Sequence, residues 1–155
     1  MKVRVAELRE AVRTLNFEES AGALNETVIA ATGWTGQRFE KDVAVAAEIY
    51  LSGSDVYFSG SLTGMVTCTC PRCLDEFSLD LGRNFRFLLV TARDVEADQG
   101  LDRYSGSEID LGPLVREQAV LELDGSALCL RECRGLCAGC GVNLNREECS
   151  CKKGE

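Results

Sequence analysis

The sequence contains no histidine, only two prolines and a single tryptophan. Without histidine, it lacks the side chain that most often acts as a general acid or base near neutral pH. It also lacks a glycine-rich phosphate loop and any Ser/His/Asp set. We therefore expect that the protein is not an enzyme and that it has no small-molecule substrate.

Long hydrophobic runs are missing as well. The longest aliphatic run, residues 87–90, is far shorter than the roughly 20 residues that a membrane-spanning helix needs. The first ten residues include Glu7, Arg9 and Glu10 instead of the apolar stretch of a signal peptide. We expect a cytoplasmic protein with no membrane contact, in a compartment where disulfides are rare.

Positive charge is in short supply, because 17 Lys and Arg residues face 25 Asp and Glu residues and give a net charge of −8. This balance repels phosphates, so RNA binding requires a local basic patch. The candidates surround the cysteines and are interrupted by Glu132, Glu147 and Glu148; they are Arg72, Arg131, Arg134, Arg146, Lys152 and Lys153. A basic protein partner is as compatible with the overall charge as RNA is.

Three aromatic residues, Tyr50, Tyr57 and Phe58, lie in expected strands and are candidates for stacking on RNA bases. Aromatic residues at such positions more often belong to the core and surface of a sheet. They add little weight to an RNA-binding function by themselves.

Cysteine, by contrast, is abundant, with nine residues in two clusters. The first cluster is Cys68-Thr-Cys70-Pro-Arg-Cys73, and the second runs from Cys129 to Cys151. A Cys-x2-Cys pair suits a tetrahedral metal ion, because the tight turn directs both sulfurs at one point. From Cys129 onward large apolar side chains are rare, so metal is the natural substitute for a hydrophobic core.

Eight cysteines are the predicted metal ligands: Cys70, Cys73, Cys129, Cys133, Cys137, Cys140, Cys149 and Cys151. The favoured grouping joins the first four into a long-range site and the last four into a local site. A rival grouping makes Cys129, Cys133, Cys137 and Cys140 one local site. Cys68 is left over, and we expect it to be a buried free thiol.

The expected cofactor is Zn²⁺, with two ions per chain. An iron–sulfur cluster is the alternative, because four thiolates bind either metal. The Cys-x2-Cys-x2-Cys-x3-Cys run of bacterial ferredoxins is absent from the sequence. A redox-responsive or iron–sulfur protein is thus the competing functional class.

The predicted fold class is α+β. Apolar residues alternate through 43–90, with turns expected at Gly53 and at 82–84, and indicate an antiparallel β-meander that becomes barrel-like if its curl continues. One helix is expected at 111–123, with Asp110 as its N-cap, packed on the sheet.

The ends of this core are less regular. Before it, residues 3–8 and 15–18 are candidate strands, and 11–15 is an alternative helical turn. Residues 91–108 form a polar, acidic connection between the sheet and the helix. The expected organisation is an α+β domain at 1–128 and a Cys-rich, metal-bound tail at 129–155 docked on it.

These cysteine blocks also carry a family resemblance. The stretches 66–77 (VTCTCPRCLDEF), 109–111 and 115–123, and the tail 133–151 (CRGLCAGCGVNLNREECSC), resemble the bacterial YceD family over roughly residues 40–151. One departure is Leu123-Asp124, where the family often has Leu-Pro. The resemblance implies a role in ribosome biogenesis and 23S rRNA accumulation, with rRNA or a large-subunit ribosomal protein as partner and with no established catalytic activity.

Overall fold

The computed structural model describes residues 1–33, 36–92, 102–123 and 125–151. A six-stranded sheet forms the body of the protein, with β2 (Arg13–Glu19), β4 (Val43–Ser52), β5 (Asp55–Thr69), β6 (Glu76–Thr91) and β7 (Asp102–Tyr104) in that order, and with β3 (Gln37–Phe39) paired to β5. All pairs in this sheet are antiparallel except the parallel pair β6–β7. A separate ribbon pairs β1 (Lys2–Arg4) with β8 (Glu108–Asp110).

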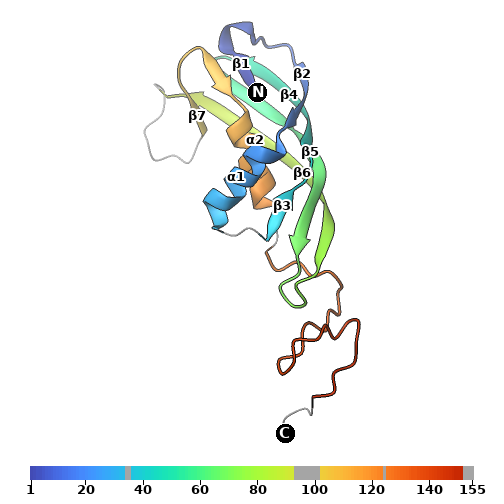
Figure 1. Cartoon of the computed structure of the whole chain (residues 1–155). Helices are drawn as coiled ribbons and strands as arrows, with labels where there is room; N and C mark the ends of the chain where they lie inside the picture. Colours follow the sequence, from blue (N-terminus) through green and yellow to red (C-terminus); the bar gives the residue numbers. More distant parts are fainter. Residues whose placement is uncertain (34–35, 93–101, 124, 152–155) are drawn as a thin grey trace.

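Two helices, α1 (Ala21–Thr32) and α2 (Gly112–Leu121), lie together on one side of the sheet (Figure 1). The inward-facing residues of β4 and β5 fit the alternation of a sheet with one buried face; Val45, Ile49, Phe58 and Leu62 are each almost fully buried. Leu24 of α1 and Val115 of α2 are also fully buried and complete this core. The opposite face of the sheet carries mostly small and polar side chains.

One contact within the sheet depends on a glycine. Gly60 of β5 pairs with Ala47 of β4, and a Cβ atom at residue 60 would lie 2.3 Å from the backbone oxygen of Ala46. No side chain fits at that distance, so the close approach of the two strands requires glycine.

The hairpin β5–β6 is the longest feature of the molecule and extends beyond the helices (Figure 1). Its turn contains Cys70 and Cys73, and the C-terminal tail continues past this turn. We call residues 65–80 together with 125–151 the distal arm. The distal arm is where the two cysteine clusters of the sequence meet.

The α+β class and the meander are confirmed, but several details differ from expectation. The sheet is open and is not closed into a barrel, and there are two helices instead of one. The turn expected at 82–84 does not exist, because β6 continues through it. The second helix ends at Leu121 instead of residue 123, and Leu111 is its N-cap; Asp110 instead accepts a hydrogen bond from the amide of Gly112 at 3.1 Å.

At the N-terminal end, the strand expected at 3–8 is limited to β1 and is followed by a 3₁₀ turn at Val5–Glu7. The strand at 15–18 is confirmed within β2, so the alternative helical turn at 11–15 is wrong. Of the acidic connection at 91–108, residues 93–101 lie outside the described part of the chain, and 102–104 and 108–110 are strands. No helix among the described residues is both long and apolar enough to span a bilayer.

Candidate metal centres

Eight of the nine cysteines gather into two groups of four at the distal arm. Site 1 contains Cys70, Cys73, Cys129 and Cys133, and site 2 contains Cys137, Cys140, Cys149 and Cys151. Within each group the sulfur atoms all lie within 4.8 Å of one another. The structure thus brings together the residues of the favoured grouping, and it separates those of the rival one.

The spacing of the sulfurs fits a shared metal ion and not a disulfide. The Sγ atoms of Cys70 and Cys133 are 3.8 Å apart, and those of Cys73 and Cys129 are 3.4 Å apart. In site 2, Cys149 lies 3.1 Å from Cys137 and 3.4 Å from Cys140. Two thiolates bound at about 2.3 Å to one tetrahedral ion are about 3.8 Å apart, whereas a disulfide bond is about 2.0 Å long.

The two Cys-x2-Cys turns are the same backbone motif used twice. In the first turn, the amide of Cys70 donates to the carbonyl of Asp75 and the amide of Leu74 donates to the carbonyl of Cys70, both at 2.9 Å. In the second turn, Cys137 donates to Val142 and Gly141 donates to Cys137, both at 2.8 Å. This equivalence indicates that both turns present their sulfurs in the same way, so we call them knuckle 1 (residues 70–75) and knuckle 2 (residues 137–142).

The acid–base properties of the thiols fit a cation at each site. In site 1, burial raises the pKa of Cys70, but hydrogen bonds from the backbone of Cys129, Cys73 and Arg72 outweigh it and lower that pKa to about 6. Burial raises the pKa of Cys73 to about 12, and contacts with the other three thiols of site 1 raise it as well, although a hydrogen bond from the backbone of Asp75 lowers it. In the metal-free site, repulsion between like charges prevents four thiolates from coexisting at this spacing. A divalent cation bound to the sulfurs stabilises their negative charge, so that all four can be deprotonated.

Site 2 follows the same pattern in a more exposed setting. The thiol of Cys149 lowers the pKa of Cys137 to about 6 through their hydrogen bond, and the backbone of Cys140 and Gly139 adds to the effect. The same contact with Cys137 raises the pKa of Cys149 to about 12. Cys140 and Cys151 are exposed, while Cys70, Cys73 and Cys133 of site 1 are buried. The donor sets of both sites therefore fit a metal, and site 1 is the more protected of the two.

Asparagine side chains, which the sequence did not identify as functional, support the cysteines. The Nδ2 atom of Asn145 lies 3.3 Å from the sulfur of Cys133 and donates to it, and its Oδ1 accepts from the amide of Arg134 at 2.7 Å. Asn143 donates to Asp75 in knuckle 1 at 2.8 Å. The Asn-Leu-Asn segment between the ligands of site 2 thus fixes site 2 against site 1. The feature of the sequence that could have identified this segment is its position among the cysteines of the tail.

The ninth cysteine lies apart from both sites. Cys68 is 2% exposed in the core, and the prediction of a buried free thiol is confirmed. Burial raises the pKa of Cys68, although a hydrogen bond from Gln37 lowers it slightly. Cys68 is thus protonated and packed like an apolar side chain.

The candidate basic patch is only partly free. Arg72 donates to the carbonyl of Cys133 at 3.1 Å, and Arg146 forms an ion pair with Asp75 at 3.0 Å. Lys152 and Lys153 lie outside the described residues. Among the described residues, three basic side chains of the set, those of Arg72, Arg131 and Arg134, lack an ion-pair partner.

The expected stacking residues are also restricted. Phe58 is fully buried, so the idea that it stacks on a base is wrong. Tyr50 and Tyr57 stack on each other, with ring centroids 4.9 Å apart and planes 2° from parallel. Their faces are partly occupied by this contact.

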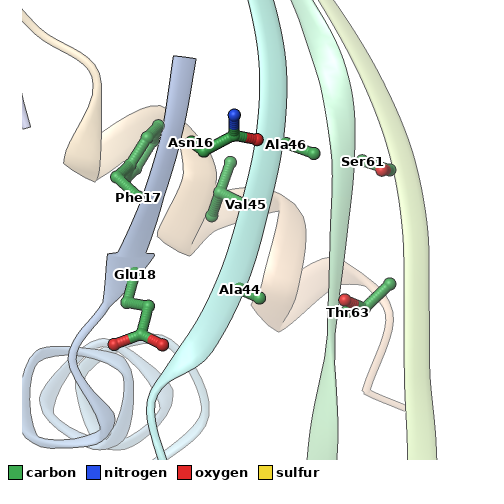
Figure 2. Close-up of a pocket in the computed structure, with 8 residues that line it drawn as sticks. All are labelled: Asn16, Phe17, Glu18, Ala44, Val45, Ala46, Ser61 and Thr63. Atoms are coloured by element: carbon green, nitrogen blue, oxygen red, sulfur yellow. The ribbon is translucent and has the colours of Figure 1, made fainter.

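The outer face of the sheet holds a shallow depression over β2, β4 and β5 (Figure 2). Short side chains form its floor, including Ala44, Ala46 and Ser61. Glu18 is the one titratable side chain among the eight residues that line it. This is not a set that performs general acid–base or nucleophilic catalysis.

Comparison with known sequences identifies the family. A family model described as "Large ribosomal RNA subunit accumulation protein YceD" matches residues 58–155. Similar relatives include the chloroplastic YCED homolog 1 proteins of two plants. The Arabidopsis thaliana protein is 24% identical over 143 residues, which covers 73% of this chain and 44% of the relative. The Zea mays protein is 25% identical over 150 residues, which covers 76% and 51%.

An uncharacterized protein of Mycobacterium leprae is 26% identical over 94 residues, which covers 58% of this chain and 43% of that protein. The chain spans about half the length of the curated relatives it matches. No solved structure matches it. The names of the family and of the two plant relatives describe an accumulation factor for ribosomal RNA and no catalytic activity. The matched residues 58–155 include all eight cysteines of the two sites and do not include α1. The chain belongs to the YceD family of large ribosomal RNA subunit accumulation proteins.

Proposed function

We propose that this protein is a non-catalytic zinc-binding factor of ribosome biogenesis that supports accumulation of 23S rRNA. It acts in the cytoplasm by binding rRNA or a large-subunit ribosomal protein. Membership of the YceD family supports the role in ribosome biogenesis, and the names of the two plant relatives support that role as well. The proposal retains the organisation into a domain at 1–128 and a zinc-bound tail at 129–155.

One observation carries the proposal: each site offers four cysteine sulfurs within 4.8 Å of one another. Structural zinc sites are closed by four protein ligands, whereas catalytic zinc keeps a position for water. Zn²⁺ bound by these eight cysteines would offset half of the thiolate charge at each site, hold the tail in shape and attach it to the turn of the β5–β6 hairpin. The role of the metal is thus to shape a binding surface.

The proposal is tested by deleting the gene and measuring precursor and mature large-subunit rRNA, with complementation by the wild type and by a Cys70→Ser, Cys137→Ser double variant. We expect mature large-subunit rRNA to fall on deletion and to recover only with the wild type. Normal rRNA levels after deletion would contradict the proposed function. Full recovery with the double variant would instead show that metal binding is not needed for it.

Metal analysis of anaerobically purified protein separates zinc from the alternative. We expect about two zinc ions per chain and a colourless sample, as closed four-cysteine sites require. Iron together with visible absorption from thiolate-bound clusters would replace the proposed function by a redox function.

A further inference from the structure

The two knuckles differ at one equivalent residue. The residue after the second cysteine takes a left-handed backbone conformation in both, with φ of 62° at Leu74 in knuckle 1 and 75° at Gly141 in knuckle 2. Glycine adopts this conformation without strain, whereas the Cβ atom of a leucine is crowded there by the following carbonyl oxygen. Leu74 is the one non-glycine residue with positive φ among the described residues.

The strain at Leu74 is not offset by burial, because its side chain is 62% exposed. Knuckle 2 shows that glycine satisfies the same hydrogen bonds. For the isolated fold a leucine at this position is therefore unfavourable both in backbone conformation and in exposed apolar area. A strained residue that the fold does not need points to a function outside the fold.

Other exposed apolar side chains share the distal arm with Leu74. Met65 and Leu130 are 56% and 58% exposed, and Leu79 and Leu136 are each 37% exposed. Leu136 lies beside knuckle 1, because its amide donates to the carbonyl of Arg72 at 3.0 Å. Met65 and Leu79 lie on opposite faces of the hairpin, because Met65 pairs with Asp80 whereas Leu79 pairs with Val66. The three exposed leucines at positions 74, 130 and 136 lie next to ligands or the turn of site 1, and exposed apolar side chains gathered in this way suit a surface that binds another molecule.

The charge of the distal arm decides between the two classes of partner. Its described residues include four arginines, at positions 72, 131, 134 and 146, and six carboxylates, at positions 75, 76, 80, 132, 147 and 148. Each zinc bound by four thiolates would add a further charge of about −2. A net negative arm with exposed leucines repels the phosphate backbone and suits an apolar recess with a positive rim.

We propose that the distal arm docks on a protein of the large ribosomal subunit, and that Leu74 inserts as the apolar anchor into a recess rimmed by basic residues. This inference rests on the proposed function and narrows its partner from rRNA or protein to protein. It assigns Leu74 a binding role that explains why a strained, exposed leucine occupies a position where glycine would serve the fold.

The test measures binding of the zinc-loaded full chain to two probes: the individually purified proteins of the large ribosomal subunit, and protein-free large-subunit rRNA. Leu74→Asn removes the apolar anchor but tolerates the left-handed backbone. Leu121→Asn is the matched control, because Leu121 of α2 is 61% exposed and lies outside the distal arm. We expect Leu74→Asn to weaken binding to a ribosomal protein by about tenfold or more, as loss of a buried leucine does, and Leu121→Asn to leave it unchanged.

Leu74→Met should retain most of the affinity, because it preserves an apolar side chain. Zinc content is measured for every variant, and if Leu74→Asn loses metal, Leu74→Gly replaces it, since Gly141 shows that the knuckle accepts glycine. Unchanged protein binding by the Leu74 variant would overturn the inference. Binding of the wild type to rRNA alone would overturn it while leaving the proposed function in place, and binding to neither probe would remove both.

Discussion

The sulfur of Cys73, in the turn between β5 and β6, lies 3.4 Å from the sulfur of Cys129, although the two residues are 56 positions apart in the sequence. The intervening chain includes β6 and α2, so this contact joins two segments that are distant in the sequence. A metal held there closes a large loop and stabilises the folded state by its binding free energy. Site 1 is therefore the attachment of the tail, whereas site 2 is formed within the tail.

Cys70→Ser is expected to lower the metal content from about two ions to about one, because site 1 loses a thiolate and a structural site needs all four ligands. Residues 129–136 should then exchange their amide hydrogens faster, while 137–151 keep their protection. Hydrogen exchange followed by mass spectrometry, with metal analysis of the same sample, makes the measurement. Cys68→Ala is the matched control and should leave both sites loaded; loss of metal in that control would make Cys68 a ligand.

Cys137→Ser is expected to open site 2 alone. Residues 137–151 should lose their protection from amide exchange. Cys129 and Cys133 belong to site 1, so residues up to about 136 should keep their protection and the tail should stay attached to the hairpin. Amide exchange of the β4–β6 strands should be unchanged. Faster exchange at 129–133 in this variant would show that the two sites fold as one unit.

The cysteine pattern predicted which residues come together because a metal site imposes its geometry on ligand spacing. Period-two alternation predicted the inward faces of β4 and β5 for a similar reason: burial on one side leaves a strong local signal. Helix α1 was missed, although Ser20 accepts a hydrogen bond from the amide of Ala23 as N-cap and Gly33 ends the helix with φ of 65°. Within it, Leu24 and Val28 alone are buried, so its apolar pattern is short.

The continuity of β6 could not be predicted from local residues. Gly82-Arg83-Asn84 has turn composition, yet Gly82 pairs with Thr63 and Asn84 pairs with Ser61 across the hairpin. Pairing with β5 along its whole length outweighs the local preference, as tertiary contacts often do. The significance of Leu74 in knuckle 1 likewise could not be predicted from the sequence, because it depends on the backbone angle φ of that residue.

Removal of metal should disorganise the tail and leave the sheet folded. A chelator that extracts both ions is expected to raise amide exchange throughout 129–151, because this segment has few buried apolar side chains to hold it. Phe58 belongs to a core cluster separate from the one formed by Cys70, Cys73 and Cys133, and that core should keep its protection. Reloading with Co²⁺ should restore protection and give the strong visible absorption of tetrahedral cobalt thiolates. A tail that stays protected without metal would contradict the structural role of the ions.

Arg116→Ala tests a buried ion pair that joins α2 to β2. Arg116 donates to the carboxylate of Glu19, whose side chain is 7% exposed. Removing the arginine leaves a buried carboxylate without its partner, which is expected to cost about 3–5 kcal/mol of unfolding free energy. Urea denaturation measures the loss. Arg13→Ala is the control, since Arg13 pairs with Glu7 at 3.6 Å on an exposed surface and should change stability by about 0.5 kcal/mol or less.

Gly60→Ala tests whether the close approach of β4 and β5 shapes the sheet independently of the metal sites. A methyl group at residue 60 would meet the backbone of Ala46 and Ala47, which cannot move without breaking strand pairs. We expect a loss of about 1–3 kcal/mol, the usual effect of overpacking, with the metal content unchanged because residue 60 is far along β5 from knuckle 1. Gly82→Ala on β6 is the matched control: its added methyl meets no atom within 4 Å and should leave stability equal or slightly higher. Equal effects of the two substitutions in urea denaturation would show that the contact at Gly60 relaxes, and that the spacing of the strands is set elsewhere.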